Sequence, residues 1–219
     1  MAKKLTALVA GASGLVGGEC VKRLLASDAW DRVVVLTRRD LDGLARRPKV
    51  RQVVADFARL DAVREELRAD HVFCALGTTI RKAGSQAKFR EVDCEYPLRL
   101  ARLARAGGAR HFSIVSALGA SRSSPFFYSR VKGEVEEGLR SMGWPSLAIF
   151  RPSVIAGDRG ESRPLERVSQ QLLRLAPATW RSVAATDIAA AMLAVALVSP
   201  PGVTVVESRD IAARAHAAR

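Results

Sequence analysis

An apolar run followed by three glycines near the start of the chain restricts the possible fold more than any other feature. The stretch from Leu5 to Gly17 predicts a buried strand, a tight turn and the first turn of a helix, with glycines spaced as G-x-x-G-x-x-G. This spacing suits a phosphate cradle, because a glycine turn and the free N–H groups of a helix N-terminus can receive an anion. Glycine turns also join strands to helices where nothing binds, so the pattern does not decide the matter alone. The residues expected around the phosphates are Gly11, Ser13, Gly14, Leu15 and Val16.

The rest of the chain alternates between short apolar runs and longer segments with a helical period. The expected strands are Thr6–Ala10, Arg32–Thr37, Val50–Ala55, His71–Leu76, His111–Ser116, Leu147–Phe150 and Val203–Val206. The expected helices are Leu15–Ala26, Leu60–Arg68, Gln86–Ala106, Pro125–Met142, Leu165–Leu175 and Thr186–Val198. Unbroken apolar strands alternating with helices predict an α/β fold: a doubly wound, mostly parallel, Rossmann-like sheet of about seven strands with helices on both faces.

Composition fits one globular domain over residues 1–219, with a small substrate-side part starting near residue 153, since 48% of the residues are apolar and 26% charged. The formal net charge is +13, but the 28 arginines and 7 lysines are spread along the chain and aromatic residues make up only 5%. Dispersed charge with few stacking rings argues against a nucleic-acid partner. The charge does favour anionic small molecules.

The cysteines and the longest late apolar run indicate the compartment. Cys20, Cys74 and Cys94 show no metal-ligand or redox spacing, so we expect reduced, buried thiols, no bound metal and a cytoplasmic protein. The apolar run Ile188–Val198 is too short to cross a bilayer, so no membrane segment is expected.

The residues after the second expected strand bear on the choice of dinucleotide. In a doubly wound sheet, ligands lie beyond the carboxyl ends of the strands, and an acid after the second strand favours NAD. This chain carries Arg38 and Arg39 there instead. Guanidinium groups can hold a 2′-phosphate, so we expect NADP(H) in preference to NAD(H). The alternative is that both arginines are solvated surface charges.

Two further strand ends supply candidate contacts to the cofactor. Asp56 can accept from the adenine amino group while Phe57 flanks the ring, although a turn aspartate is nearly as good an explanation. Leu76, Gly77 and Thr78 follow the fourth expected strand, where they would approach the ribose or diphosphate. An ordinary strand-to-loop turn is the alternative here.

A serine, a tyrosine and a lysine follow the fifth expected strand. Tyr128 and Lys132 are separated by four residues and therefore share one helix face, and Ser116 stands twelve residues before the tyrosine. An ammonium group beside a phenol favours the phenolate, which tunes the tyrosine for proton transfer during hydride transfer. Ser116 would hydrogen-bond the same substrate oxygen. Ser124 and Pro125 are expected to cap and open this helix.

Several motifs together resemble the short-chain dehydrogenase/reductase superfamily. The chain is similar to an atypical branch of it, the Tat-interacting-protein oxidoreductase group. The segments that carry the resemblance are Cys74–Thr79 with Lys82–Gly84, Ala106–Gly108 with His111–Phe112, Ser124–Glu136, Phe150–Pro152 and Asp158–Pro164.

The resemblance implies a Rossmann-like fold, NADP(H) binding and a catalytic set of Ser116, Tyr128 and Lys132. It also implies that Lys132 contacts the nicotinamide ribose and that the loop from Pro152 through Val154 lies near the carboxamide. One departure concerns Asp93, which stands where the superfamily often has an asparagine that supports a proton relay. An ionised carboxylate cannot donate a hydrogen bond, so the usual relay is in doubt.

Other charged residues have less specific interpretations. Arg81, Lys82, Arg159 and Arg163 either grip an anionic substrate group or, more in keeping with isolated loop cations, face solvent. The expected solvated helix face contains Glu134, Glu136 and Glu137.

The sequence therefore predicts an NADP(H)-dependent oxidoreductase that acts on a small carbonyl or alcohol substrate. A protein that binds NADP(H) and a partner with little turnover is the alternative from another class. Only 67 residues follow Pro152, which argues against a large sugar-nucleotide pocket. The sequence does not decide between a monomer and a homodimer.

Overall fold

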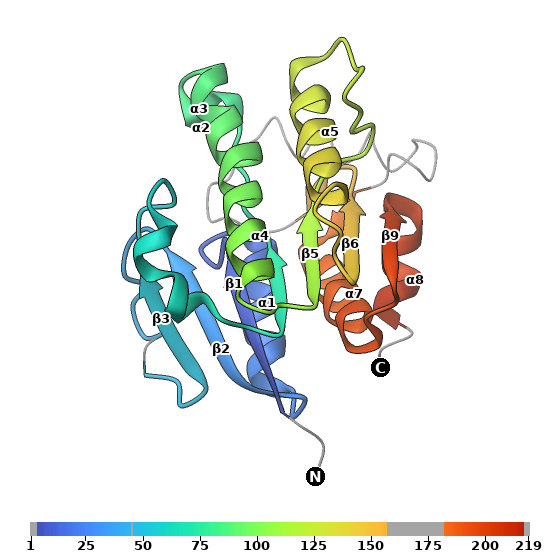
Figure 1. Ribbon diagram of the computed structural model, residues 1–219. Coiled ribbons are helices and arrows are strands. Elements are labelled where there is room, and N and C mark those ends of the chain that lie inside the picture. Colours follow the sequence, from blue (N-terminus) through green and yellow to red (C-terminus); the bar gives the residue numbers. More distant parts are fainter. Residues whose placement is uncertain (1–3, 45, 157–181, 217–219) are drawn as a thin grey trace.

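The computed structural model describes residues 4–44, 46–156 and 182–216. A seven-stranded, fully parallel sheet in the order β3-β2-β1-β4-β5-β6-β9 forms its centre (Figure 1). The strands of this sheet are β1 Leu5–Ala10, β2 Trp30–Thr37, β3 Val50–Val54, β4 His71–Cys74, β5 His111–Val115, β6 Ser146–Arg151 and β9 Gly202–Glu207. A second, two-stranded parallel sheet pairs β7 Ile155–Ala156 with β8 Val183–Ala184.

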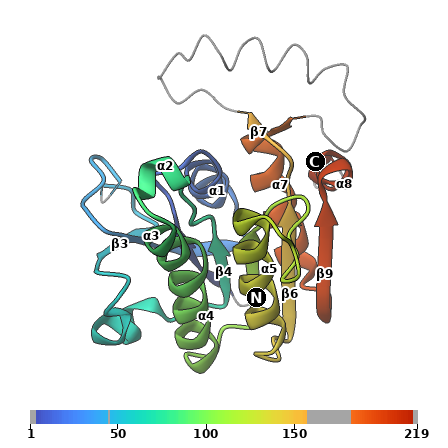
Figure 2. The same cartoon turned by 90° about the horizontal axis from the view of Figure 1, so that it is seen from above.

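Helices cover both faces of the large sheet. Seen from above, α1, α7 and α8 lie on one side and α3, α4 and α5 on the other (Figure 2). The helical segments are α1 Leu15–Ala26, η1 (3₁₀) Leu60–Leu67, α2 Ile80–Ala83, α3 Gln86–Arg90, η2 (π) Glu91–Glu95, α4 Tyr96–Ala106, α5 Phe127–Arg140, α7 Ala185–Val198 and α8 Ser208–His216. The expected α/β fold, doubly wound with helices on both faces, is thus confirmed.

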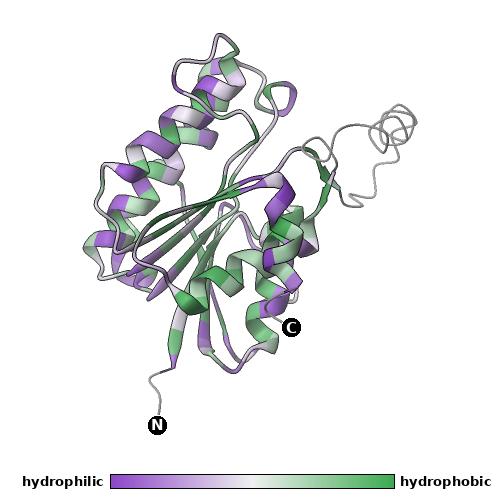
Figure 3. Ribbon diagram, turned by 90° about the vertical axis from the view of Figure 1, so that its right-hand side faces the viewer, coloured by the Kyte–Doolittle hydropathy of each residue, from purple (hydrophilic) through white to green (hydrophobic). Residues whose placement is uncertain are grey.

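Two hydrophobic cores follow from this layering. One core packs alternate residues of the strands, such as Val9 and Val35, against α1 and α7. The other core packs the opposite set, such as Leu8 and Val34, against α4 and α5. Because both sheet faces are covered, the central strands are apolar on both sides, which is why they read as unbroken Val, Ile and Leu runs (Figure 3).

The carboxyl ends of the strands are the place where this topology binds ligands. After β1 the chain crosses to β2 on one side, whereas β4 lies on the other side of β1. The strand order therefore reverses between β1 and β4, and a crevice opens beyond their carboxyl ends.

All seven expected strands are present, each shifted by at most two residues at either end. Helix α5 differs from its expected start: it begins at Phe127 with Phe126 at the N-cap position, so the prediction that Ser124 caps the helix was wrong. The Ser124 hydroxyl instead accepts from the Phe126 N–H at 3.2 Å, which closes a turn just before the helix. The expected helix Leu165–Leu175 lies outside the described residues.

Two further expectations concern the cysteines and the membrane. All three thiols are free and buried, and burial raises their pKa values to about 12 for Cys20 and about 11 for Cys74 and Cys94. In the part of the chain that the structure describes, no helix combines the length and the apolar character needed to cross a membrane. The same residues contain no group of three or more His, Cys, Asp or Glu side chains that could hold a metal ion.

Candidate active site

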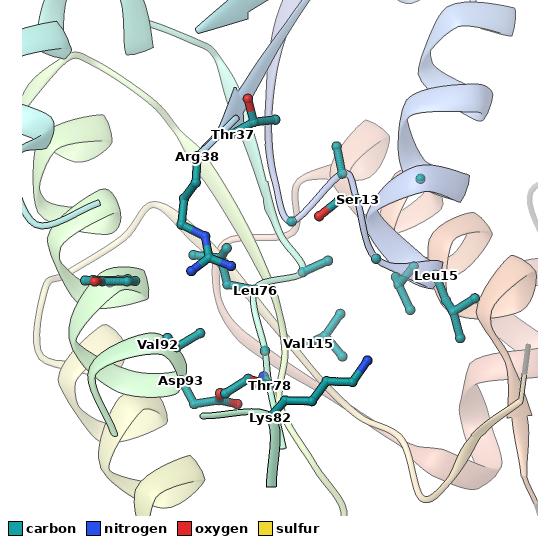
Figure 4. A pocket seen from close by; sticks show the side chains of 18 of the residues that line it. Ser13, Leu15, Thr37, Arg38, Leu76, Thr78, Lys82, Val92, Asp93 and Val115 are labelled. Carbon is teal, nitrogen blue, oxygen red and sulfur yellow. The ribbon is translucent and has the colours of Figure 1, made fainter. Parts of the chain in front are cut away.

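A cavity of about 1250 Å³ lies at the carboxyl ends of β1, β2, β4 and β5. It brings together residues that stand far apart in the sequence: the glycine turn after β1, the end of β2, the loop after β4 and the start of α5. Figure 4 shows Thr37 and Arg38 at one end of this cavity and Thr78, Asp93 and Lys82 at the other. The cavity therefore joins the end of β2 to the loop after β4.

The glycine turn has the form expected of a phosphate cradle. Gly11 has φ of +92°, and a Cβ there would stand 2.4 Å from the carbonyl oxygen of Ala75, so no other residue fits. Gly14 differs, because a Cβ there would meet only the Gly11 carbonyl oxygen, at 3.3 Å. That contact is tight but less severe than the one at Gly11, and Gly14 lines the cavity. Without a side chain at position 14, a ligand can approach the backbone closely.

The N-terminus of α1 is prepared for an anion. Gly14 occupies the N-cap position without a side-chain hydrogen bond to the helix, and the first turn carries no acidic residue. The free N–H groups of this turn point toward the cavity end of the helix and carry its partial positive charge. The five residues expected around the phosphates, Gly11, Ser13, Gly14, Leu15 and Val16, all line the cavity.

The end of β2 supplies two exposed guanidinium groups. Arg38 and Arg39 both line the cavity, and neither makes an ion pair with another described residue. Thr37 beside them is 6% exposed, and its hydroxyl has no hydrogen-bond partner among the described residues. A buried hydroxyl without a partner is costly unless a ligand or water satisfies it.

Charge around the cavity is predominantly positive. The lining cations outnumber the lining carboxylates six to two, the cations being Lys22, Arg38, Arg39, Lys82, Lys88 and Lys132 and the carboxylates Glu19 and Asp93. Glu19 pairs with Lys22 at 2.6 Å, and Asp93 pairs with Lys132 at 2.8 Å. Lys88 pairs with Glu91 at 2.6 Å, which leaves Arg38, Arg39 and Lys82 without an ion pair among the described residues. This positive excess suits a ligand with several phosphate charges.

The structure separates the two residues expected at the adenine. Phe57 lines the cavity from a buried position, where its ring packs 5.5 Å from that of Tyr96. Asp56 is exposed and is not among the residues that line the cavity; its Oδ1 accepts from the Ala58 N–H at 2.9 Å. This hydrogen bond to the second residue along the chain is typical of an aspartate in a turn.

The loop after β4 and the start of α5 form the opposite end. Leu76, Gly77 and Thr78 line the cavity together with Ser116, Tyr128 and Lys132. Tyr128 is 41% exposed, whereas Lys132, one turn further along α5, is 4% exposed. The phenol is thus accessible from the cavity, and the ammonium group lies behind it.

Asp93 holds that ammonium group. Its Oδ1 lies 2.8 Å from Lys132 Nζ, and its Oδ2 accepts from the Thr78 N–H at 2.8 Å. Burial on its own would lower the pKa of Lys132, but the attraction of Asp93, with a smaller contribution from Tyr128, raises it instead. Lys132 therefore stays protonated as half of a buried ion pair.

Ser116 belongs to a different network. Its Oγ donates to Glu136 Oε1 at 2.5 Å, and Arg151 binds both oxygens of Glu136, through Nε at 3.0 Å and Nη2 at 2.6 Å. Arg151 also binds Glu207 at 3.0 Å. The hydrogen bonds of Glu136 raise the pKa of Arg151 above its usual value. Ser116 lines the cavity, but its proton is directed at Glu136.

The three glutamates of α5 do not all lie on a solvated face of the helix. Glu136 is 3% exposed, so the prediction of a solvated face was wrong for this residue, whose burial is explained by its two hydrogen bonds from Arg151. Glu134 is partly buried and pairs with Arg90, and Glu137 is exposed as expected.

Residues after β6 meet the cavity at one point. Ile155 lines it, whereas Pro152 is buried, Val154 is 44% exposed, and neither of these two is among the lining residues. The Pro152 carbonyl oxygen accepts from the Leu118 N–H at 2.8 Å. Arg159 and Arg163, together with the Asp158–Pro164 motif, lie outside the described residues.

Sequence reasoning missed several lining residues. The buried hydroxyl of Thr37 and the side chains of Val115 and Ile155 carry no sequence signal beyond their position just before or after strand ends. Asp93 was noted as a departure from a pattern, but its pairing with Lys132 joins residues 39 positions apart and could not be read from spacing. Lys82 was expected to face solvent more than a ligand, and it lines the cavity.

The fold and the cavity define a dinucleotide-binding protein of the doubly wound α/β class. The sequence comparisons agree: the chain belongs to the NAD(P)H-binding family, whose model matches residues 11–198, and is an atypical short-chain dehydrogenase/reductase of the Tat-interacting-protein group. It is 39% identical to protein HTATIP2 of Rattus norvegicus over 196 residues, which cover 88% of this chain and 81% of that one. It is 33% identical to the mitochondrial protein fmp52 of Emericella nidulans, over 73% of this chain and 71% of the relative.

Solved structures share the fold at low sequence identity. An oxidoreductase of the short-chain dehydrogenase/reductase family from Burkholderia thailandensis superposes with a TM-score of 0.71 at 21% identity, over 96% of this chain and 94% of that one. MoeE5 in complex with UDP-glucose and NAD superposes with a TM-score of 0.70 at 17% identity, over 97% of this chain and 81% of that one. At these identities the likeness establishes the fold.

Proposed function

We propose that this protein is an NADP(H)-dependent oxidoreductase that interconverts a small carbonyl compound and the corresponding alcohol. The observation that carries the proposal is that Tyr128 and Lys132 line the same cavity as the glycine turn and Arg38. One ligand can therefore contact a phosphate cradle, a pair of arginines and an accessible phenol at once.

The lining residues fit such a cofactor from end to end. The N–H groups at the start of α1 would hold the diphosphate, beside the glycine backbone at Gly14. Arg38, Arg39 and the unpartnered hydroxyl of Thr37 would hold a 2′-phosphate on the adenosine ribose. The loop after β4 would pass along the middle of the cofactor. Bound in this way, the nicotinamide supplies or receives the hydride.

Tyr128 would transfer the proton. In the reducing direction its hydroxyl donates to the substrate oxygen as the carbonyl carbon receives the hydride, and the reverse applies to an alcohol. Lys132 has three N–H donors, of which Asp93 takes one, so it can still bind ribose hydroxyls. Ser116 directs its proton at Glu136, so in this arrangement it can only accept from the substrate or from Tyr128.

Replacement of the tyrosine tests this assignment. NADPH oxidation over a panel of aldehydes and ketones should fall by about 100-fold or more in Tyr128→Phe, because the proton donor is lost. The chain has only one other tyrosine, Tyr96, whose hydroxyl binds Glu91. Tyr96 also lines the cavity, but its hydroxyl is already bound to Glu91, so Tyr96→Phe should retain most of the rate of NADPH oxidation. Equal rates in the wild type and Tyr128→Phe would exclude tyrosine as the proton donor.

A binding protein with little turnover is the second candidate, and the hydrogen bond from Ser116 to Glu136 favours it. A serine already committed to an internal carboxylate cannot donate to a carbonyl substrate. This candidate predicts tight NADPH binding by a wild type that is inert across the whole panel.

Location and assembly remain predictions. We place the protein in the cytoplasm, as a monomer or homodimer, while relatives from Emericella nidulans and Candida albicans are named mitochondrial. Imaging of a tagged chain in its own cells distinguishes the two compartments.

A further inference from the structure

We propose that Asp93 is a positioning residue that fixes the Lys132 ammonium group and cancels most of its charge toward Tyr128, so that the tyrosine keeps its proton and donates it. The proposal rests on the proposed role of Tyr128 as proton donor. It also specifies the form of the tyrosine, since a protonated phenol is the form that can donate to a carbonyl oxygen during reduction.

Asp93 joins three parts of the molecule. Its carboxylate binds Lys132 of α5 through one oxygen and the Thr78 N–H of the loop after β4 through the other, each at 2.8 Å. The side chains of the pair are 6% exposed for Lys132 and 1% exposed for Asp93. Water therefore screens the pair poorly, and small changes in its charge are felt strongly nearby.

The backbone around Asp93 is a single π turn, η2, between α3 and α4. Such turns insert an extra residue into a helix and occur frequently at functional sites. The turn contains two more acids that face elsewhere: Glu91 binds Lys88 and Tyr96, and Glu95 is exposed. Of the three acids in this turn, Asp93 is the one that binds Lys132.

The charges around Lys132 explain the expected effect. The groups that face it are Asp93 from η2, Tyr128 from α5 and Cys74 from β4. Tyr128 also packs against the Phe89 ring of α3, with centroids 5.6 Å apart, and shares the cavity with the cations Lys82 and Lys88. An unpaired ammonium group beside a phenol stabilises the phenolate, whereas an ion pair acts on it only as a dipole. Asp93 therefore replaces a lone cation beside the phenol with an ion pair.

The two tyrosines of the chain allow a direct test without substrate or cofactor. In a Tyr96→Phe background, the ultraviolet absorbance of tyrosinate reports the ionisation of Tyr128 alone. Adding Asp93→Asn, which keeps an acceptor for Thr78, should lower the midpoint of this titration by about one pH unit. Glu95→Gln removes an equal charge from the same turn without touching Lys132 and should leave the midpoint in place.

A second variant covers the case in which Asp93→Asn does not fold. Lys132→Gln removes the cation and keeps a partner for Asp93, and should raise the midpoint. An unchanged or higher midpoint in folded Asp93→Asn, or an unchanged or lower one in Lys132→Gln, would overturn the proposal. Because the titration needs no turnover, a protein inactive on every carbonyl tested would contradict the proposed function and leave this measurement intact.

Discussion

The sheet carries a buried polar cluster at each end, and the two differ in charge and access. At the carboxyl end, Asp93 and Lys132 form an ion pair behind the cavity. At the amino end, His111 lies between two serines, with Nδ1 2.9 Å from Ser146 Oγ and Nε2 2.7 Å from Ser113 Oγ. The cluster at the cavity is charged and within reach of a ligand, and the cluster at the other end is closed.

Burial decides the protonation of the amino-end cluster. Burial, with a smaller contribution from His71, whose ring centroid lies 5.5 Å away, lowers the pKa of His111 to about 3. Burial also lowers the pKa of His71. Both rings are therefore neutral near pH 7. The comparison teaches that the charged pair lies where a ligand can contact it, whereas the closed histidine cluster is neutral.

The largest expected effect comes from breaking the ion pair. Lys132→Met leaves the Asp93 carboxylate buried without its counter-charge and should lower the free energy of unfolding by about 3 kcal/mol or more. The double variant Asp93→Asn/Lys132→Met should recover most of this loss, because no buried charge remains. Urea unfolding of the four proteins in the cycle measures both values, and an additive cycle would contradict a direct pair.

Acid should lower the stability of the protein through His111, at the amino end of the sheet. The unfolded chain binds a proton at each histidine near pH 6.5, whereas folded His111 stays neutral down to about pH 3. More protons are then bound in the unfolded state, so stability is complete above pH 6.5 and falls as the pH is lowered. His111 alone should cost about 1.4 kcal/mol for each pH unit, or about 2 kcal/mol at pH 5.

Urea unfolding at pH 7 and pH 5 measures this loss, and a matched pair of variants locates it. His111→Gln should make stability less dependent on pH, whereas the same change at exposed His216 should not. A pH dependence that survives in folded His111→Gln would place its source elsewhere.

A smaller effect is expected at the adenosine half of the cavity. Arg38→Ala removes one exposed guanidinium group from the predicted 2′-phosphate site and should reduce the preference for NADPH over NADH by about tenfold, with little effect on stability. Fluorescence titration with both coenzymes measures the ratio. A wild type that binds both equally would refute the assignment of Arg38 and Arg39 to a 2′-phosphate.

The sequence predicted the sheet well because each central strand is buried on both faces and is therefore mostly apolar. It also predicted that the candidate residues share one site, because parallel strands place their carboxyl ends at one edge of the sheet. Its errors concern contacts across the fold. Glu136 has the spacing of a surface residue, and only the position of Arg151 on β6 makes it a buried one. The contacts of Asp93 with Lys132 and Thr78 likewise join residues that are distant in sequence.

Helix α5 is held by ion pairs along its inner side and by ring packing at its beginning. Arg151 binds Glu136 in its second half and Asp93 binds Lys132 one turn earlier, while the Tyr128 ring packs against Phe89 with 41% of the residue exposed. Tyr128 therefore borders α3 and the cavity at once, so a change in the position of α3 would alter how its hydroxyl meets a ligand.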